Sequence, residues 1–179
     1  MYSFVRIDRY VTDSAPSNWA MLGGGTRVDF RAKPSLSLTG DLTTSTLGGP
    51  FALFTGDIGA RVRPQWNGHS RPYVDARVSL AYTYDSYAQL YASSIFVPPS
   101  GFNSSGRTTS TGVGALIGGG VETALSDRWG VNMGLSASHH RMLAVRVGQQ
   151  RAGSSWNFNV NTVRLTFGVR YNPRRLIRE

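Results

Sequence analysis

The stretch Val163-Arg-Leu-Thr-Phe-Gly-Val-Arg-Tyr-Asn172 decides the fold of this chain. Every second residue from Val163 to Tyr171 is apolar, and the residues between them include Arg164 and Arg170. Side chains alternate between the two faces of a β-strand, so this segment predicts a strand with one apolar and one charged face. The two faces must meet different media.

The same alternation recurs about eight times along the chain. The other segments that carry it are residues 2–10, 20–31, 35–43, 52–63, 73–85, 112–125 and 131–147. Between Trp156 and Val160 the apolar residues have the opposite parity to Val163, which predicts a β-bulge near Asn161 and Thr162. This series of two-faced strands predicts an all-β protein.

Length and composition support this fold class and exclude others. A chain of 179 residues suits one domain, predicted as residues 1–179, and 40% hydrophobic against 16% charged residues excludes a disordered polyelectrolyte. Twenty-one glycines, eight prolines and no apolar run of about 18 residues argue against a helical bundle and a transmembrane helix. The absence of cysteine excludes disulfides and thiolate metal sites. The first residues already read as a strand, so no signal peptide is expected in this chain.

Long and short connections alternate along the chain. The predicted long loops lie near residues 9–18, 43–51, 86–110 and 148–156, and a basic tail covers residues 173–179. The other connections are short, so the long loops all fall at one end of an up-and-down set of strands. About eight antiparallel strands in this order close into a barrel without exposed edges.

Two arrangements of the faces are open. In a soluble lipocalin-like barrel the apolar face points inward, whereas in an outer-membrane barrel it meets lipid and the charged face lines the lumen. The charged face carries both signs in near balance, so it can neutralise itself inside a barrel. Lys33 is the only lysine, and the planar fork of arginine suits enclosed bidentate carboxylate pairs. Both observations favour the outer-membrane arrangement.

The aromatic residues favour the same arrangement, because many lie near strand ends, where membrane barrels carry interfacial girdles. They are Phe30, Phe54, Trp66, Tyr73, Tyr82, Tyr84, Trp129 and Tyr171.

The outer-membrane arrangement assigns a role to each face. The predicted lumen charge network consists of Arg6, Asp8, Arg27, Asp29, Arg31, Asp41, Asp57, Arg61, Arg63, Asp75, Arg77, Glu122, Arg164 and Arg170. The residues predicted to face lipid are Val28, Phe30, Leu36, Leu38, Ile58, Val62, Val78, Leu80, Ile117, Val131, Met133, Leu135, Val163, Leu165, Phe167 and Val169. An eight-stranded barrel is just wide enough inside for side chains, so these charges predict a plugged lumen and no open pore.

The net charge of +9 raises the question of nucleic-acid binding. The arginines are spread one or two to a strand with acids nearby. A nucleic-acid site would collect basic residues into a patch with interleaved aromatic platforms. No nucleic-acid partner is expected.

Stretches spanning nearly the whole chain carry a family resemblance. They are Tyr2-Ser-Phe-Val-Arg-Ile-Asp8, Gly59-Ala-Arg-Val-Arg63, Arg71-Pro-Tyr-Val74, Gly118-Gly-Gly-Val-Glu-Thr-Ala-Leu-Ser-Asp-Arg-Trp129 and the closing strand up to Tyr171. Together they resemble the small eight-stranded outer-membrane β-barrel family, the porin-like proteins related to the transmembrane domains of outer membrane proteins A and X. The resemblance implies a transmembrane barrel in the bacterial outer membrane. That family usually ends on an aromatic residue, whereas this chain continues to Glu179.

The expected function is that of a structural or surface-interaction protein, because long loops on a rigid barrel are suited to recognition. Membrane lipid is the expected partner, with lipopolysaccharide as a candidate. Arg107, Arg141, Arg146 and Arg151 lie in or near the long loops, where acidic headgroups or a protein could bind them. The alternative is an accessory subunit of an envelope complex, paired through the loops or through protruding strands.

An enzyme is a further alternative, centred on Ser136, Ser138, His139 and His140, because small outer-membrane lipid A deacylases use a serine and a histidine on the barrel wall. Adjacent Ser138 and His139 face opposite sides of a strand, Ser138 and His140 lie about two strand rises apart, and no acid occurs between residues 132 and 148. We therefore predict no enzyme and no catalytic residues.

Metal and cofactor sites are not predicted either. Adjacent His139 and His140 face opposite sides, and His69 lies in a distant turn, so three convergent ligands are lacking. Gly23-Gly-Gly25 and Gly118-Gly-Gly120 are followed by neither the lysine nor the helix of a phosphate loop, so they are strand glycines.

Overall fold

The computed structural model describes residues 2–12, 15–46, 51–65, 68–85, 108–147, 150–151 and 158–171. Their side chains are described from Leu22 onward, except those of Phe51, Asp85, Thr108, Val145, Val147, Gln150, Arg151 and Phe158. The strands are β1 (Tyr2–Thr12), β2 (Ala15–Lys33), β3 (Leu36–Thr46), β4 (Phe51–Val62), β5 (Ser70–Asp85), β6 (Thr108–Ala124), β7 (Trp129–Val147), β8 (Gln150–Arg151) and β9 (Phe158–Tyr171). None of the described residues forms a helix that is long and apolar enough to cross a membrane.

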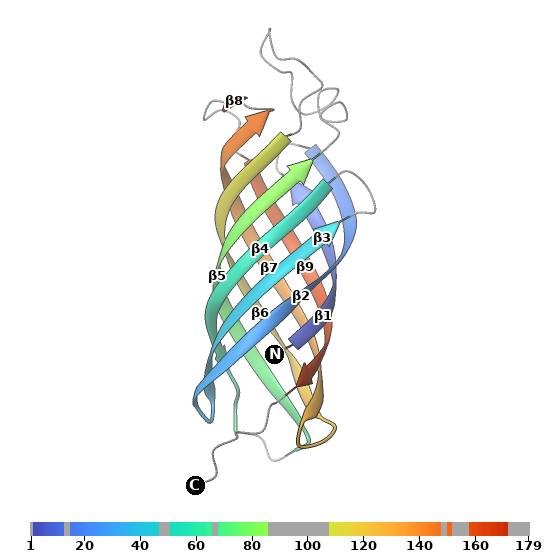
Figure 1. Ribbon diagram of the computed structural model, residues 1–179, viewed down its shortest axis with the longest axis vertical. Coiled ribbons are helices and arrows are strands. Elements are labelled where there is room, and N and C mark those ends of the chain that lie inside the picture. Colours follow the sequence, from blue (N-terminus) through green and yellow to red (C-terminus); the bar gives the residue numbers. More distant parts are fainter. Residues whose placement is uncertain are drawn as a thin grey trace.

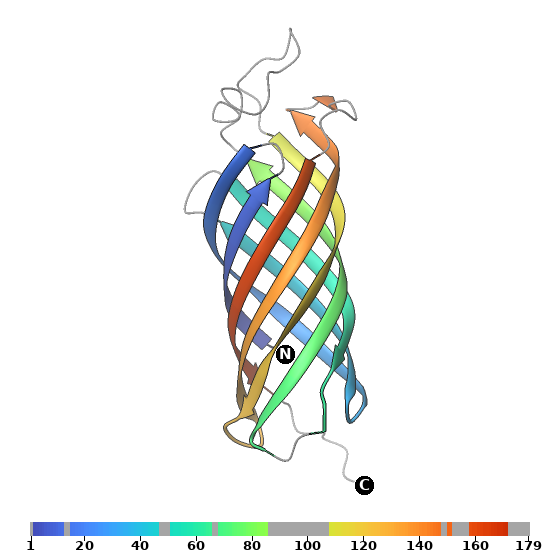
Figure 2. The ribbon, with the colours of Figure 1, turned by 180° about the vertical axis from the view of Figure 1, so that it is seen from behind.

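The sheet closes on itself. β9 pairs with β7 on one side and with β1 on the other, while β6 pairs with both β5 and β7. The eight longer strands therefore form a barrel, and the two-residue β8 lies at the end of β7. Figures 1 and 2 show these strands tilted around a common axis, with β9 beside β1. The prediction of an all-β, eight-stranded, antiparallel up-and-down barrel is confirmed.

The register of the strands sets the width of the barrel. Ile7 of β1 pairs directly with Leu22 of β2. The residues that pair in turn from Ile7 through β9, β7, β6, β5, β4 and β3 lead back to β2 at Lys33. Lys33 lies eleven residues after Leu22, and this difference is the stagger of the barrel. Such a stagger tilts the strands strongly, and an eight-stranded barrel is narrow enough inside for side chains to fill it.

The two ends of the barrel differ in their connections. The β2–β3, β4–β5 and β6–β7 connections lie at one end, the turn end, at the bottom of Figure 1. The β6–β7 turn is tight, since the backbone N–H groups of Leu125 and Ser126 both donate to the Trp129 carbonyl at 3.0 Å. The opposite end, where β1 connects to β2, β3 to β4 and β5 to β6, is the loop end.

The strands at the loop end are longer than the sequence pattern predicts. β1 and β2 stay paired up to Thr12 and Ala15, and β3 and β4 up to Thr46 and Ala52. Residues 11–12, 15–18, 44–46, 51 and 108–110, which lie in the predicted loops and outside the predicted strands, therefore belong to strands. Backbone hydrogen bonds continue the ladder there although the alternation of side chains fades. Most of the other predicted loop residues, and the basic tail, lie outside the described residues.

The predicted bulge near Asn161 and Thr162 is wrong. β9 keeps an unbroken register against both β1 and β7 in this region. Val160 is fully buried inside the barrel, and Asn161 pairs with the exposed His139 on the outer side. The polarity of the two faces reverses near the loop end, and the strand does not slip by one residue.

Glycine allows neighbouring strands to approach closely where the sheet curves. A Cβ at Gly59 would lie 2.1 Å from the Ala76 carbonyl oxygen, and one at Gly120 would lie 2.2 Å from the Met133 carbonyl oxygen. Real Cβ atoms do not come so near to a neighbouring backbone. The tight curvature of the barrel therefore requires glycine at these positions.

Candidate functional site: the lumen and the outer wall

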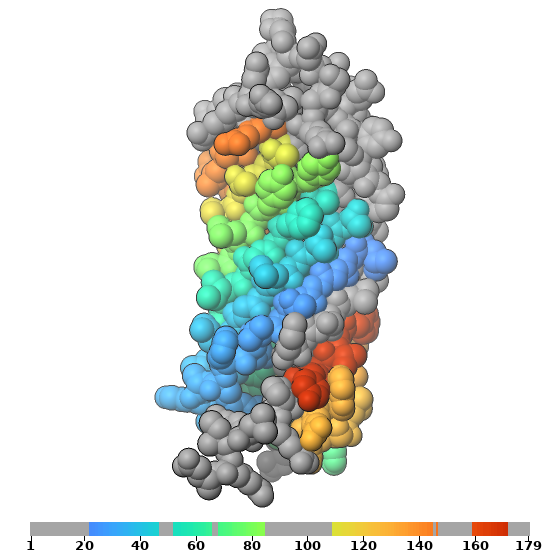
Figure 3. Space-filling view, viewed as in Figure 1, coloured from blue at the N-terminus to red at the C-terminus, as the bar shows by residue number. Residues whose placement is uncertain are grey.

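The outer wall of the barrel is apolar. Leu36 and Leu165 are half-buried, and the other residues predicted to face lipid are exposed on the outer surface, Leu80 to 67% and Phe30 to 66%. Figure 3 shows the side chains of β2 to β5 as oblique rows on this wall. These apolar side chains form a belt around the barrel. In water, each Å² of apolar surface that stays exposed forgoes roughly 25 cal/mol of stabilising free energy. The lipocalin-like arrangement, which turns this face inward, is wrong.

Aromatic pairs lie near both edges of the apolar belt. The rings of Trp129 and Tyr171 have centroids 5.0 Å apart at the turn end. Those of Phe54 and Tyr82 are 6.0 Å apart nearer the loop end. Two such edges are typical of the interfacial girdles of membrane barrels.

Inside the barrel, Asp41 of β3 is the centre of one cluster of charges. It accepts two hydrogen bonds of 2.6 Å from Arg27 of β2 and another from Arg77 of β5. Arg77 also donates to Asp75. The Arg27 side chain is 7% exposed, and those of Arg77, Asp75 and Asp41 are 3% or less. The bidentate Arg27–Asp41 pair has the geometry of the strongest charge-assisted hydrogen bonds.

Glu122 of β6 is the centre of a second cluster, nearer the turn end. It accepts hydrogen bonds from Arg61 at 2.5 Å, from Arg63 at 3.0 Å and from Arg170 at 3.2 Å. Arg63 also donates to Asp29 at 2.9 Å. These contacts tie β2, β4, β6 and β9 together across the lumen.

Arg61 joins the two clusters. Besides Glu122 it binds Asp75, at 2.7 Å, and its guanidinium lies 3.7 Å from the centroid of the Tyr73 ring. Tyr73 is buried in the lumen because it shares the parity of Asp75, so its assignment to an interfacial girdle is wrong. The ring supplies a cation–π contact to a charge removed from water.

A third group crosses the lumen from β9 to β4 and β5 and returns to β7, the neighbour of β9. Arg164 lies 3.4 Å from Asp57, Ser79 donates to Asp57, and His140 Nε2 lies 2.8 Å from Ser79 Oγ. Because the single hydroxyl proton of Ser79 goes to Asp57, His140 is the donor to Ser79. These contacts could not be predicted from the sequence, because the four residues lie on four different strands.

Pairing decides whether these buried charges are tolerated. Withdrawal of an ion from water costs several kcal/mol even after relaxation of the protein. Each described lumen carboxylate meets at least one guanidinium: Asp29, Asp41, Asp57, Asp75 and Glu122. The attraction between the opposite charges therefore offsets the free-energy cost of removing both the carboxylates and the guanidinium groups from water.

Towards the loop end the inward side chains become neutral. Hydroxyl groups pair across strands, as in Thr43–Thr55 and Ser138–Thr162, both at 2.6 Å. Leu53, Met142 and Val160 are fully buried there. The sequence signal for this change is the reversed parity that Val160 shows against Val163.

Some predicted lumen residues are not part of the described clusters. Arg31 is exposed at the turn end. Arg6 and Asp8 pair through the backbone with Thr166 and Arg164, and their side chains lie outside the described ones.

The candidate catalytic residues separate in space. Ser136 is half-buried, and Ser138 and His140 both face the lumen, but Ser138 bonds Thr162 while His140 bonds Ser79. His139 faces outward and bonds Asn161 at 2.6 Å. Within the described ranges, no three His, Cys, Asp or Glu side chains come together to hold a metal ion.

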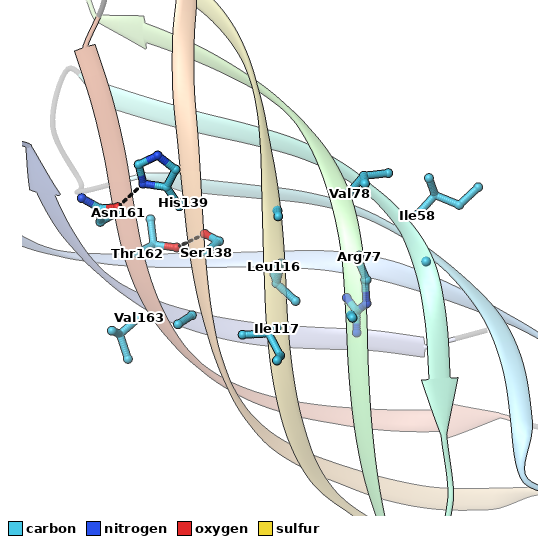
Figure 4. Close-up of a pocket in the computed structure, with 14 residues that line it drawn as sticks. Ile58, Arg77, Val78, Leu116, Ile117, Ser138, His139, Asn161, Thr162 and Val163 are labelled. Atoms are coloured by element: carbon cyan, nitrogen blue, oxygen red, sulfur yellow. Dashed lines mark hydrogen bonds between the residues drawn. The ribbon is translucent and has the colours of Figure 1, made fainter.

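A shallow groove of about 910 Å³ runs over the outer wall across β4, β5, β6, β7 and β9. Its floor includes the small side chains of Ala76, Ala115 and Ala137. Figure 4 shows Val78 and Ile117 along it, with the His139–Asn161 contact at one end.

Solved structures of other proteins share this architecture. The chain superposes on neisserial surface protein A with a TM-score of 0.66, 18% identity and 95% coverage of both chains. It superposes on Ail, the attachment invasion locus protein of Yersinia pestis, with a TM-score of 0.51, 9% identity and 95% coverage of both chains. No protein-family model and no curated protein sequence matches it. The chain has the fold of the small outer-membrane β-barrels, as the resemblance in its motifs implies.

Proposed function

We propose that this chain is a bacterial outer-membrane barrel with a plugged lumen, acting as a structural or surface-interaction protein rather than as an open pore. The observation that carries the proposal is the set of buried arginine–carboxylate bonds that cross the lumen, such as Arg61–Glu122 at 2.5 Å. These bonds join strands that are not neighbours in the sheet, and Arg164–Asp57 joins β9 to β4 on the opposite side of the barrel, so they occupy the path that an ion would take.

Conductance in a planar lipid bilayer tests the plug. The wild-type chain should give no steps above the background of the lipid. The double variant Arg61→Ala with Glu122→Ala removes both partners of one pair, and its conductance should rise. Steps of porin size from the wild type would overturn the plugged lumen.

We also propose that the chain is not an enzyme. A serine nucleophile needs a histidine that accepts its proton, with an acid orienting the histidine. In the lumen the order is reversed, because His140 donates to Ser79 and Ser79 donates to Asp57. This geometry holds the serine as a structural link between its two neighbours.

The partners follow from the two surfaces. The outer wall meets membrane lipid, with lipopolysaccharide as the candidate on the loop-end side, and the loops are the part suited to recognise a protein. Dependence on detergent tests membrane residence: the purified chain should be monodisperse and heat-modifiable in detergent, and should aggregate without it. A stable, monodisperse chain without detergent would contradict it.

A further inference from the structure

One stretch of the outer wall combines an apolar groove with a polar end. The groove is lined by Ile58, Val78, Ile117 and Val163, each more than half exposed on the outer surface, around the three alanines of its floor. Its volume is about 910 Å³, and it is open to the outside of the barrel. Small residues beside large ones thus leave room on the wall for an extended apolar chain.

The wall changes character abruptly at the loop-end side of this groove. On β7 the outward residues run from Ala137 to His139 and Arg141, and on β9 their cross-strand partners are Val163, Asn161 and Asn159. One apolar pair is therefore followed by two polar pairs. His139 and Arg141 are both exposed.

Hydrogen bonding orients the histidine at this boundary. His139 Nδ1 lies 2.6 Å from Asn161 Oδ1, and an amide oxygen only accepts, so Nδ1 carries the proton. The other ring nitrogen, Nε2, is then an acceptor, which suits a hydroxyl group of a phosphate monoester outside the protein wall. Two residues further along the same face, Arg141 adds a permanent positive charge and a planar set of donors.

We propose that this groove and its polar end form a fixed site for one phosphate-bearing lipid, with an acyl chain in the groove and the headgroup phosphate bound by Arg141 and His139. The order of the two parts matches such a lipid, because the polar end with Arg141 lies on the loop-end side of the apolar groove. Arginine binds phosphate oxygens in a bidentate manner, which gives the charge complementarity. The site rests on the proposed membrane residence of the barrel.

Native mass spectrometry of the detergent-solubilised barrel tests the site with two probes. Phosphatidic acid and diacylglycerol with identical acyl chains differ only in the phosphate. The wild type should retain one phosphatidic acid molecule and much less diacylglycerol. Equal retention of the two, or displacement of the lipid by an equal concentration of inorganic phosphate, would overturn the lipid headgroup as the ligand.

Three variants separate the parts of the site. Arg141→Ala should lower retention of phosphatidic acid about tenfold, in line with the loss of a charge-assisted hydrogen bond. The matched control is Arg128→Ala, an exposed arginine in the β6–β7 turn at the other end of the barrel, and its retention should be unchanged. Ala115→Phe fills the groove and should lower retention of both lipids.

Heat-modifiable mobility on a gel shows whether each variant is folded, so a misfolded variant is recognised. The milder Ala115→Val then replaces Ala115→Phe. A folded wild-type barrel that retains neither lipid would reject the lipid site and leave the proposed barrel intact. A chain that never folds in detergent would reject the barrel itself.

Discussion

At the scale of single residues, the carboxylates of the lumen accept the arginine hydrogen bonds that join different strands. Asp41 alone binds Arg27 and Arg77 from two strands and is fully buried at its side chain. A buried charge that loses its partner is strongly destabilising, whereas an exposed charge contributes little. The lumen is therefore sensitive to changes that leave one sign in excess.

Asp41→Asn tests this sensitivity while keeping the shape of the side chain. It leaves Arg27 without its bidentate acceptor, and we expect the free energy of unfolding in lipid bilayers to fall by about 3–5 kcal/mol. Urea titration followed by tryptophan fluorescence measures the loss. The exposed Arg31→Gln is the control, with an expected change within about 0.5 kcal/mol. Equal effects of the two substitutions would show that the lumen pairs do not stabilise the barrel.

The sequence predicted most of the described inward-facing charges, with exposed Arg31 as an exception, but not which of them meet. Parity along each strand places Arg63 and Glu122 on the same side of the sheet, yet 59 positions separate them in the chain. Their contact depends on the stagger of the closed barrel, which no single strand encodes. The contacts of Asp57 with Ser79, and of Ser79 with His140, were missed for the same reason.

At the scale of strands, curvature is set by glycine. Gly59 faces the backbone of β5 so closely that a Cβ would overlap the Ala76 carbonyl. Gly40 on the neighbouring strand has only the Asp57 carbonyl oxygen near its position, at 3.9 Å, which is an ordinary contact. The two glycines therefore differ in what a methyl group would do.

Gly59→Ala should destabilise the barrel by about 1–3 kcal/mol, because the added methyl forces β4 and β5 apart. Gly40→Ala should have little effect, and serves as the matched control. The fraction of folded, heat-modifiable protein after refolding into lipid vesicles gives the comparison. The opposite order of the two variants would refute the close approach of β4 and β5 at this point.

The ends of the strands were the least predictable part of the fold. Alternation identifies a strand only where the two faces meet different media, and near the loop end both faces change. Inward Val160 is apolar and outward Asn161 is polar, so parity indicated a bulge where the register is in fact continuous. The backbone hydrogen bonds between strands do not depend on the polarity of the side chains, so the strands extend beyond the predicted limits.

At the scale of the whole molecule, the barrel has an inverted distribution of polarity. Charged residues are paired inside, and apolar residues are exposed outside between two aromatic edges. Such a surface is stable only in lipid. The sequence predicted this arrangement, because apolar and charged residues alternate along each strand and lysine is scarce. The change from charged to neutral side chains along the lumen could not be predicted, because it depends on how far each residue lies from the turn end of the barrel.

In this barrel the apolar face of each strand meets lipid and the charged face meets the lumen. The absence of cysteine allows single cysteines to be introduced and labelled with a nitroxide along β5, at Ala76, Val78, Leu80 and Tyr82. In lipid bilayers, electron paramagnetic resonance then measures the access of oxygen and of a water-soluble nickel chelate to each label. We expect high access for oxygen and low access for the chelate at Val78 and Leu80, while a label at the exposed turn residue Arg128 should show the reverse. High access of the nickel chelate at Val78 and Leu80 would contradict this arrangement of the two faces.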